Sequence, residues 1–307
     1  MKDPDDASAL AASRTTGLGL AFAIGAFLIW GVFPIFFKQL DTVPALEVLA
    51  HRVVWSTCFT AGLLTILGRW RAVVIGLRNL RLFLSLVLSA FVISLNWGVF
   101  IWAVANSRVL ESSLGYYINP LVSVFLGVLV LRERLRVAQW AAVALAGVGI
   151  AHEVVRLEEM PWVALTLACS FAAYGLIRKT ADVDPLTGLF VETAIMTPLA
   201  LAYLLLAPVN AAGVLWQTAD ARTLFLLVMA GALTTLPLLL FVGAAKRIRL
   251  STLGLLQYIV PTGHFLIAVY LYGEALSPWR IMTFVCIWIA LVIYSLPALR
   301  GRHRSLA

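Results

Sequence analysis

Residues 108–135 read RVLESSLGYYINPLVSVFLGVLVLRERL, and residues 249–276 read RLSTLGLLQYIVPTGHFLIAVYLYGEAL. Aligned without gaps, the two stretches share an arginine at the start, a tyrosine–isoleucine pair, a proline and a glutamate near the end. The identical pairs include Tyr117 and Tyr258, Ile118 and Ile259, Pro120 and Pro261, and Glu133 and Glu274. Similarity at one fixed separation along a chain indicates an internal repeat. The alternative is chance similarity between two leucine-rich segments.

The composition of the chain indicates a membrane protein. Of its 307 residues, 62% are hydrophobic and 12% are charged, whereas a typical soluble domain carries about 25% charged residues. So little charge cannot cover a water-facing surface, which excludes a soluble enzyme. The net charge of +8 would suggest a nucleic-acid partner in a soluble protein, but membrane proteins concentrate Lys and Arg in cytoplasmic loops. We therefore expect the lipid bilayer as a partner, and no nucleic acid.

Ten apolar runs are candidates for crossing a bilayer, which takes roughly 20 apolar residues per helix. Open strands are excluded because their backbone groups would stay unpaired in lipid. The predicted fold class is an all-α integral membrane protein with ten transmembrane helices. They are expected near residues 17–37, 46–67, 82–105, 109–131, 137–152, 161–177, 186–207, 223–244, 250–272 and 279–298.

The positive charges predict the orientation of these helices. Most of the 23 Lys and Arg residues fall in alternate connections, starting with the N-terminal tail and ending with the C-terminal tail. Positive connections stay in the cytoplasm, so both termini are predicted to be cytoplasmic. The predicted organisation is a tail at residues 1–16, a first five-helix repeat at 17–153, a second repeat at 161–298 and a basic tail at 299–307.

An odd number of helices per repeat has a consequence for function. The second copy must enter the membrane from the opposite side, so the two repeats are inverted around a central cavity. Inverted repeats are typical of secondary transporters, whose two halves exchange conformations to open each face in turn. The sequence therefore predicts a carrier of a small-molecule substrate.

Polar side chains inside the paired helices are candidates for the substrate site. Pro120 and Pro261 each remove a backbone donor within a span, which predicts a helix break or a gate there. Polar groups are costly in lipid, so they should face the interior or a wet cavity. The alternative is hydrogen bonding between helices as a purely structural role. The predicted substrate-binding residues are Asn96, Trp97, Tyr116, Tyr117, Asn119, Gln257, Tyr258 and His264.

Ionisable residues within the spans form a second group of candidates. His51, Arg52 and Glu192 lie well inside predicted helices, where a charge costs several kcal/mol unless it is paired or hydrated. We expect one or both of His51 and Glu192 to bind a charged end of the substrate or to carry a coupling proton. Structural pairing, with Arg52 held by a carboxylate or by backbone carbonyls, is the alternative. Glu133 and Glu274 end the paired helices and are predicted gate contacts or surface salt bridges.

Several motifs resemble those of the RarD-type permeases of the EamA group in the drug/metabolite transporter superfamily. The resemblance extends over residues 17–298 and implies a ten-helix, five-plus-five permease of the bacterial inner membrane with a central cavity. It further implies export of amino acids, other metabolites or chloramphenicol-like compounds, and no catalytic residue. The motifs are PALEVLAHRVVWS (44–56), NWGVFIWAVAN (96–106), LESSLGYYINPL (110–121), FAAYGLIRK (171–179), TGLFVET (187–193), TTLPLLLF (234–241) and RLSTLGLLQYIVPT (249–262).

No motif of the sequence indicates an enzyme, a cofactor or a metal. The sequence lacks the motifs GxxxxGK[ST], HExxH and GxSxG. Their absence argues against transport driven by ATP hydrolysis in this chain, against a metalloprotease and against an esterase. Cys58, Cys169 and Cys286 lack metal-ligand spacing. Two alternatives to a carrier remain: a channel or receptor-like protein, and a membrane-embedded enzyme. The oligomeric state is open.

Overall fold

The computed structural model describes residues 4–106, 108–155, 160–206, 220–273 and 278–303. Every regular element in these ranges is helical, as the apolar runs predict. The long helices of the first part of the chain are α1 (Pro4–Gly31), α3 (Ala45–Ile66), α5 (Leu80–Ala105), α6 (Val109–Leu129) and α7 (Val137–Val154). Those of the second part are α8 (Trp162–Thr180), α9 (Pro185–Leu206), α11 (Ala221–Ala245), α12 (Leu250–Leu256), α13 (Ile259–Leu266) and α14 (Pro278–His303).

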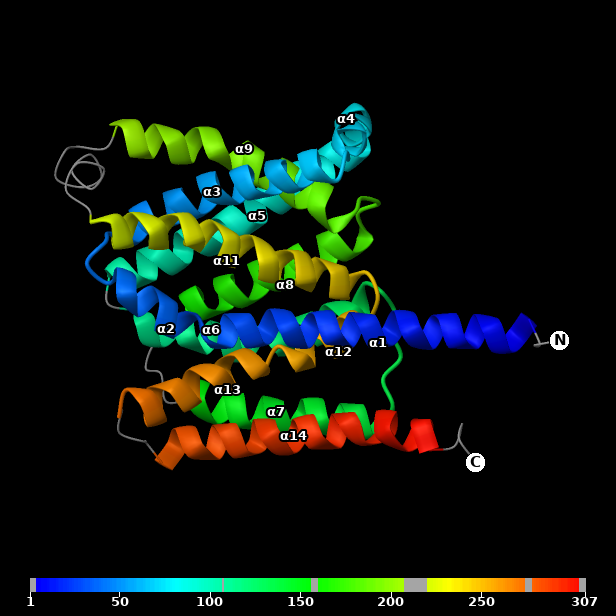
Figure 1. Cartoon of the computed structure of the whole chain (residues 1–307). Helices are drawn as coiled ribbons and strands as arrows, with labels where there is room; N and C mark the ends of the chain where they lie inside the picture. The colour runs from blue at the N-terminus through cyan, green and yellow to red at the C-terminus, as the bar shows by residue number, and fades with distance from the viewer. Residues whose placement is uncertain (1–3, 107, 156–159, 207–219, 274–277, 304–307) are drawn as a thin grey trace.

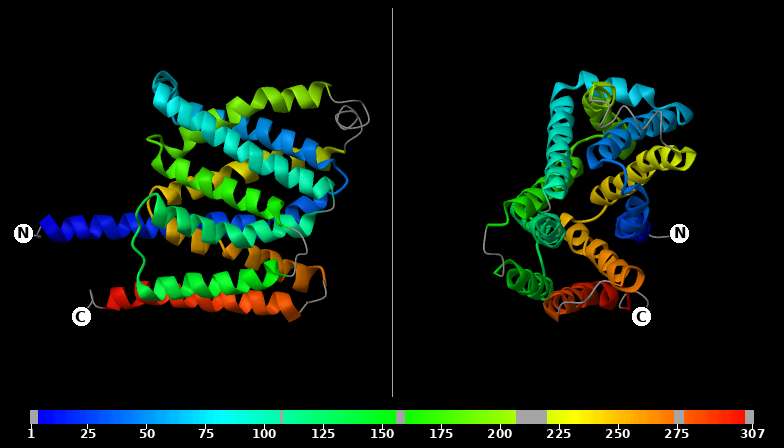
Figure 2. Two further views of the ribbon diagram at one scale, coloured as in Figure 1. Left: turned by 180° about the vertical axis from the view of Figure 1, so that it is seen from behind. Right: turned by 90° about the vertical axis from the view of Figure 1, so that its left-hand side faces the viewer.

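Short elements join or extend the long helices. Helix α2 (Phe33–Phe37) and the 3-10 turn η1 (Lys38–Leu40) follow α1, α4 (Trp70–Arg78) follows α3, and the π-helical turn η3 (Ile267–Leu271) extends α13. Figure 1 shows the long helices running side by side as one bundle, with the N- and C-terminal ends at the same end of it. Helix α1 projects beyond its neighbours at that end, which the reverse view in Figure 2 also shows.

Six helices of the described chain are long and apolar enough to cross a membrane, or seven if the bent pair α3 and α4 is one span. Length and hydropathy therefore support six or seven of the ten predicted spans. The apolar parts of α7 and α14 are shorter, at Val137–His152 and Ile281–Tyr294. Helix α8 carries Arg178 and Lys179 in its last turn, which lowers its hydropathy.

The packing of the helices repeats along the chain. Taking α1, α3, α5, α6 and α7 as counterparts of α8, α9, α11, α12–α13 and α14, the most extensive contacts in one set have equivalents in the other. Helix α6 packs on α8 and α13 on α1, while α5 packs on α8 and α11 on α1. Helix α3 likewise packs on α11 and α9 on α5, and the pairs α3–α9, α6–α12 and α7–α14 each join two counterparts.

The start of α1 and the segment around Pro120 differ from the sequence-based expectation, whereas the segment around Pro261 agrees with it. Helix α1 already begins at Pro4, within the expected tail, because ASALAAS at residues 7–13 is rich in good helix formers. Helix α6 runs without a break through Pro120, since one missing backbone donor is tolerated within a long helix. The chain does break between α12 and α13, just ahead of Pro261, which fits proline in a first helical turn.

The crossing of α6 and α12 depends on a glycine. A Cβ atom added to Gly254 would lie 2.7 Å from Ser123 Cβ and 2.9 Å from the backbone oxygen of Pro120. Both distances are too short for real contacts, and a backbone oxygen cannot swing away as a side chain can. Gly254 therefore sets how closely the two repeated segments approach.

Replacing this glycine tests the crossing. Gly254→Ala should lower the free energy of unfolding by about 1–3 kcal/mol, because an added methyl group overpacks the site. Gly62→Ala, on α3 with nothing within 4 Å of an added Cβ, should stabilise the protein slightly by removing backbone freedom. Thermal unfolding in detergent measures both, and equal effects of the two changes would contradict the close crossing.

Candidate functional site

A cavity of about 830 Å³ lies within the bundle. Its lining comes from both repeated parts, chiefly from α1, α2, α3, α5, α6, α8, α11 and α13. The lining also includes Leu40 of η1 and the connection of residues 41–44 between η1 and α3. That connection lies at the end of the bundle opposite the termini (Figure 1), so the cavity extends from that end toward the middle.

Seven of the sequence-predicted residues come together around this cavity. They are Arg52, Asn96, Trp97, Tyr116, Asn119, Gln257 and His264. Hydroxyl groups of Ser112, Ser113 and Thr234 add to the polar lining. The apolar lining includes the rings of Trp30, Phe33, Phe37, Phe100 and Phe171 beside aliphatic side chains. A cavity of this size with a mainly apolar wall and few polar groups has the character of a small-molecule site.

The two asparagines also join helices. The Nδ2 atom of Asn96 donates to Leu167 O and to Ser170 Oγ, both at 2.9 Å. The Nδ2 atom of Asn119 donates to Ala168 O at 2.9 Å. Both acceptor sets lie on α8, so each amide fixes α5 or α6 against α8 while it lines the cavity. Asn96 and Asn119 therefore fit both sequence-based interpretations: they line the candidate substrate cavity, and they hydrogen-bond between helices.

Arg52 projects into the cavity from α3. Its Nε atom donates to Thr234 Oγ1 at 2.8 Å, and its guanidinium lies 5.2 Å from the ring centre of Phe37 and 5.4 Å from that of Trp97. The sequence analysis considered a carboxylate or backbone carbonyls as its partner. The structure instead gives it a hydroxyl group and two aromatic rings, which attract a cation through their faces.

His264 links the two repeated parts at the cavity wall. Its Nε2 atom lies 3.0 Å from Trp30 O, across the contact between α13 and α1. Its ring meets that of Tyr116 edge to face, with 5.9 Å between the ring centres. The imidazole of the second half is thereby oriented by two partners from the first half of the chain.

Two predicted tyrosines do not line the cavity. Tyr117 packs edge to face on Phe284 of α14, and Tyr258 is fully buried in the apolar cluster formed with α7 and α14. Successive residues of a helix point about 100° apart, so Tyr116 and its neighbour Tyr117 cannot face the same side. The tyrosines that the repeat shares therefore serve packing, while the unshared Tyr116 faces the cavity.

His51 and Glu192 lie in separate places. His51 Nε2 is 4.0 Å from Glu47 Oε1, and both residues are buried within α3. Sequence reasoning missed Glu47, although its spacing of four residues from His51 in PALEVLAHR would place the two on one helix face. The carboxylate oxygens of Glu47 have no hydrogen-bond partner in the described part of the chain.

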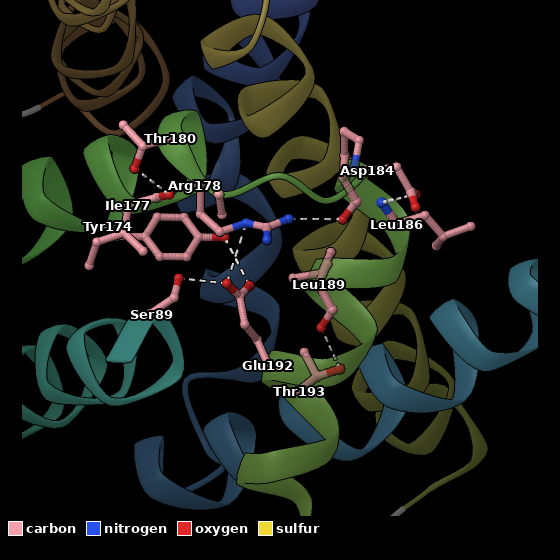
Figure 3. A network of polar contacts seen from close by, with 12 residues as sticks. Ser89, Tyr174, Ile177, Arg178, Thr180, Asp184, Leu186, Leu189, Glu192 and Thr193 are labelled. Atoms are coloured by element: carbon pink, nitrogen blue, oxygen red, sulfur yellow. Dashed lines mark hydrogen bonds and ion pairs between the residues drawn. The ribbon is translucent and has the colours of Figure 1, made fainter. Parts of the chain in front are cut away.

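Glu192 belongs to a buried cluster between α5, α8 and α9, toward the end that carries the termini. Its carboxylate accepts hydrogen bonds from Ser89 Oγ at 2.5 Å and from Tyr174 OH at 3.3 Å. Arg178 Nε lies 3.3 Å from Glu192 Oε1, and both side chains are buried. Figure 3 shows these groups pointing toward the carboxylate. Gly188 makes room for this arrangement, because a Cβ there would overlap the guanidinium of Arg178.

Further polar contacts join the two parts of the chain at this same end. Glu133, in the connection after α6, accepts hydrogen bonds from Leu250 N at 2.6 Å and from Ser251 N at 2.9 Å. It thereby satisfies the first backbone donors of α12, which have no partner inside that helix. Its counterpart Glu274 lies outside the described residues.

Two lysines reinforce this end reciprocally. Lys179, at the end of α8, donates to Ala245 O at 2.6 Å and to Ile248 O at 2.5 Å near the end of α11. Lys246, just after α11, donates to Ala181 O at 2.6 Å just after α8. Each lysine thus donates to backbone carbonyls at or just after the end of the other helix. Together with the Glu192 cluster and Glu133, these contacts close the end of the bundle near the termini.

No group of three or more His, Cys, Asp or Glu side chains that could hold a metal ion occurs in the ranges that the structure describes. Cys58 and Cys169 are exposed on the bundle, and Cys286 is half-buried.

The chain is similar to known membrane transporters. Residues 17–152 match the EamA-like transporter family. An uncharacterized transporter of Vibrio cholerae is 48% identical over 94% of this chain and 95% of its own length. Protein RarD of Salmonella typhi is 45% identical over 95% of this chain and 99% of its own. A protein of known crystal structure shares the fold with a TM-score of 0.70 at 21% identity, over 93% of this chain and 98% of its own.

The buried ion pair allows a direct test of the closed end. Arg178→Met should lower the free energy of unfolding by about 3–5 kcal/mol, because it leaves Glu192 buried without its cation. The double change Arg178→Met with Glu192→Met should recover most of that loss, since apolar replacements of a buried pair are often neutral or better. Thermal unfolding in detergent compares them. If the double variant is as unstable as Arg178→Met alone, the unpaired charge of Glu192 is not the cause of the loss, and the ion pair is not what holds α8 and α9 together at the closed end.

Proposed function

Because the chain belongs to the RarD-type permeases of the EamA-like transporter family, we propose that it is a secondary transporter that works by alternating access. Its substrates are small metabolites or drugs such as amino acids or chloramphenicol-like compounds, and its direction is export. One observation carries the proposal: a polar and aromatic cavity reaches one end of the bundle and is separated from the other end by buried polar contacts. In an alternating-access transporter, each of the two states has a cavity that is open at one end and closed at the other, and this arrangement matches one such state.

The proposal includes ten membrane spans in two inverted repeats of five. The repeated packing supports it, because helices of one set and their counterparts make equivalent contacts. A two-fold axis in the membrane plane would exchange the two sets. The position of both termini at one end supports it as well, since an even number of crossings returns the chain to the side on which it started.

Exchange between the two states follows from this symmetry. The cluster of Ser89, Tyr174, Arg178 and Glu192 would separate, and the counterpart helices would close the end where the cavity now reaches. His51 holds the position in α3 that Glu192 holds in α9, so the two mark equivalent depths from opposite ends. Glu192 and the Glu47–His51 pair are the buried groups able to carry a coupling proton.

We place the protein in the bacterial inner membrane with both termini in the cytoplasm. The connections at the end that carries the termini contain the basic segments RWR (69–71), RER (132–134), RK (178–179) and KRIR (246–249). Basic connections are retained in the cytoplasm. The cavity then faces the outside, as an exporter does when it releases its substrate.

Fusion reporters test this orientation. Green fluorescent protein attached after Ala307 should fluoresce, because it folds in the cytoplasm, whereas alkaline phosphatase attached there should be inactive. Fusions made after Asn106, at the opposite end of the bundle, should give the reverse result. The same reporter pattern at both positions would contradict both the even number of spans and the orientation.

Counterflow in proteoliposomes tests the carrier mechanism. Vesicles loaded with unlabelled phenylalanine or chloramphenicol should transiently accumulate the labelled compound, because a carrier exchanges one molecule for another. Ser113→Trp should abolish the accumulation by filling the cavity that Ser113 lines. The control is Leu199→Trp, because Leu199 is 79% exposed on the outside of the bundle; this variant should transport normally. Simple equilibration would indicate a channel, and chemical conversion of the compound without accumulation would indicate an enzyme.

A further inference from the structure

Among the described residues that line the cavity, Arg52 is the one permanent cation, and it lies deep within the bundle, about two turns into α3. The one carboxylate among them, Asp41, lies in the connection at the end of the bundle. Within the described part of the chain, no acidic side chain comes within 4.0 Å of the Arg52 nitrogens. The nearby Glu47 faces His51 instead.

The contacts of Arg52 hold it while leaving its outer edge free. Thr234 takes up the Nε donor, and the rings of Phe37 and Trp97 lie beside the guanidinium. In the part of the chain that the structure describes, the terminal nitrogens donate to no protein atom. A guanidinium offers these donors as a planar fork that fits the two oxygens of a carboxylate. Leaving them unpaired away from bulk water is costly, so the site favours an anion.

The remaining lining sets the shape of the anion's body. Trp30, Phe100 and Phe171 form apolar walls beside Trp97 and Tyr116. Trp30 and Phe171 meet edge to face, with 5.7 Å between their ring centres, as aromatic pairs prefer. A flat apolar body fits between such walls. Among the described lining residues, Arg52 is the permanently charged cation and His264 is a titratable imidazole, so a singly charged anion fits the site better than a doubly charged phosphate ester.

We propose that the transported substrate is a monocarboxylate with a flat aromatic or apolar body, and that Arg52 binds its carboxylate through the two terminal nitrogens. This inference rests on the proposed transport function and narrows its substrate class. It makes Arg52 the residue that determines specificity, with Thr234 as a positioning residue. Of the substrates considered under the proposed function, it keeps amino acids and other carboxylates and drops the neutral chloramphenicol-like compounds; organic cations, which lack the anionic group, are poor ligands as well.

Four compounds with the same phenyl body test the charge requirement on the purified full-length protein. Thermal shift in detergent should show stabilisation by 3-phenylpropanoate, by phenylalanine or by both, because ligands stabilise the state they bind. Phenylalaninamide and 2-phenylethylamine, which lack the carboxylate, should bind at least about tenfold more weakly, as expected when a hydrogen bond to a charged group is lost. Equal or stronger binding of these two cations would overturn the proposal.

Variants assign the effect to Arg52. Arg52→Gln should weaken binding of 3-phenylpropanoate by about tenfold to a hundredfold, and Arg52→Lys should retain part of the affinity because it keeps the charge. Arg81→Gln, an exposed arginine near the start of α5, should leave the affinity unchanged. Should Arg52→Gln fail to fold, the comparison of the four compounds on the unaltered protein still decides the question.

Counterflow separates this proposal from the transport function. Carboxylate binding that depends on Arg52, without exchange across the membrane, would leave the ligand class standing and remove the carrier mechanism. Exchange of 2-phenylethylamine that is unaffected by Arg52→Gln would leave the carrier standing and remove the anion site. Phenylalanine and 3-phenylpropanoate both carry the carboxylate, and their relative affinity shows whether the site prefers the zwitterion or the simple acid.

Discussion

A charge inside an apolar helix bundle must find its partner within the protein, because the surrounding hydrocarbon offers none. Arg178 and Glu192 meet this requirement together, with Ser89 and Tyr174 completing the coordination of the carboxylate. The cluster draws three helices together and closes one end of the bundle. The shape of the cavity depends on it, since a bundle closed at one end by buried charge can remain hollow at the other.

The two ends of the molecule differ in how their polar groups are satisfied. At the closed end, Glu133 and Glu192 bind groups of the opposite half. The lysines there bind backbone carbonyls within the second half. Around the cavity, by contrast, Arg52 is held by one hydroxyl group and by aromatic rings. Arg178 is ion-paired with Glu192 and makes a structural contact. Arg52 instead points its terminal nitrogens into a cavity, where a ligand can reach them. This difference separates a gate from a ligand site within one fold.

Much of the fold could be predicted from the sequence, because hydrocarbon thickness and backbone hydrogen bonding leave few choices. Seven predicted site residues do line the cavity. They could be predicted because polar groups are costly in lipid. That cost predicts that a polar side chain faces the interior, but it does not predict which neighbours the side chain contacts there. The same limit explains what the sequence could not show: Tyr117 and Tyr258 face another interior cluster, and the pairing of Glu192 with Arg178 joins two different helices. Glu47 was missed because nothing in the apolar pattern sets it apart from a residue at a helix start.

The first backbone N–H groups of helix α12 donate to the carboxylate of Glu133, which belongs to the other half of the chain. The first turn of that helix is therefore incomplete without Glu133, and Glu133 has no comparable set of donors without α12. A chain cut between α7 and α8 would yield two fragments that each lack something only the other supplies. The fragments would have to assemble with one another to regain their shape. The stability of this permease therefore depends on contacts between its two halves, as the stability of a dimer depends on its interface.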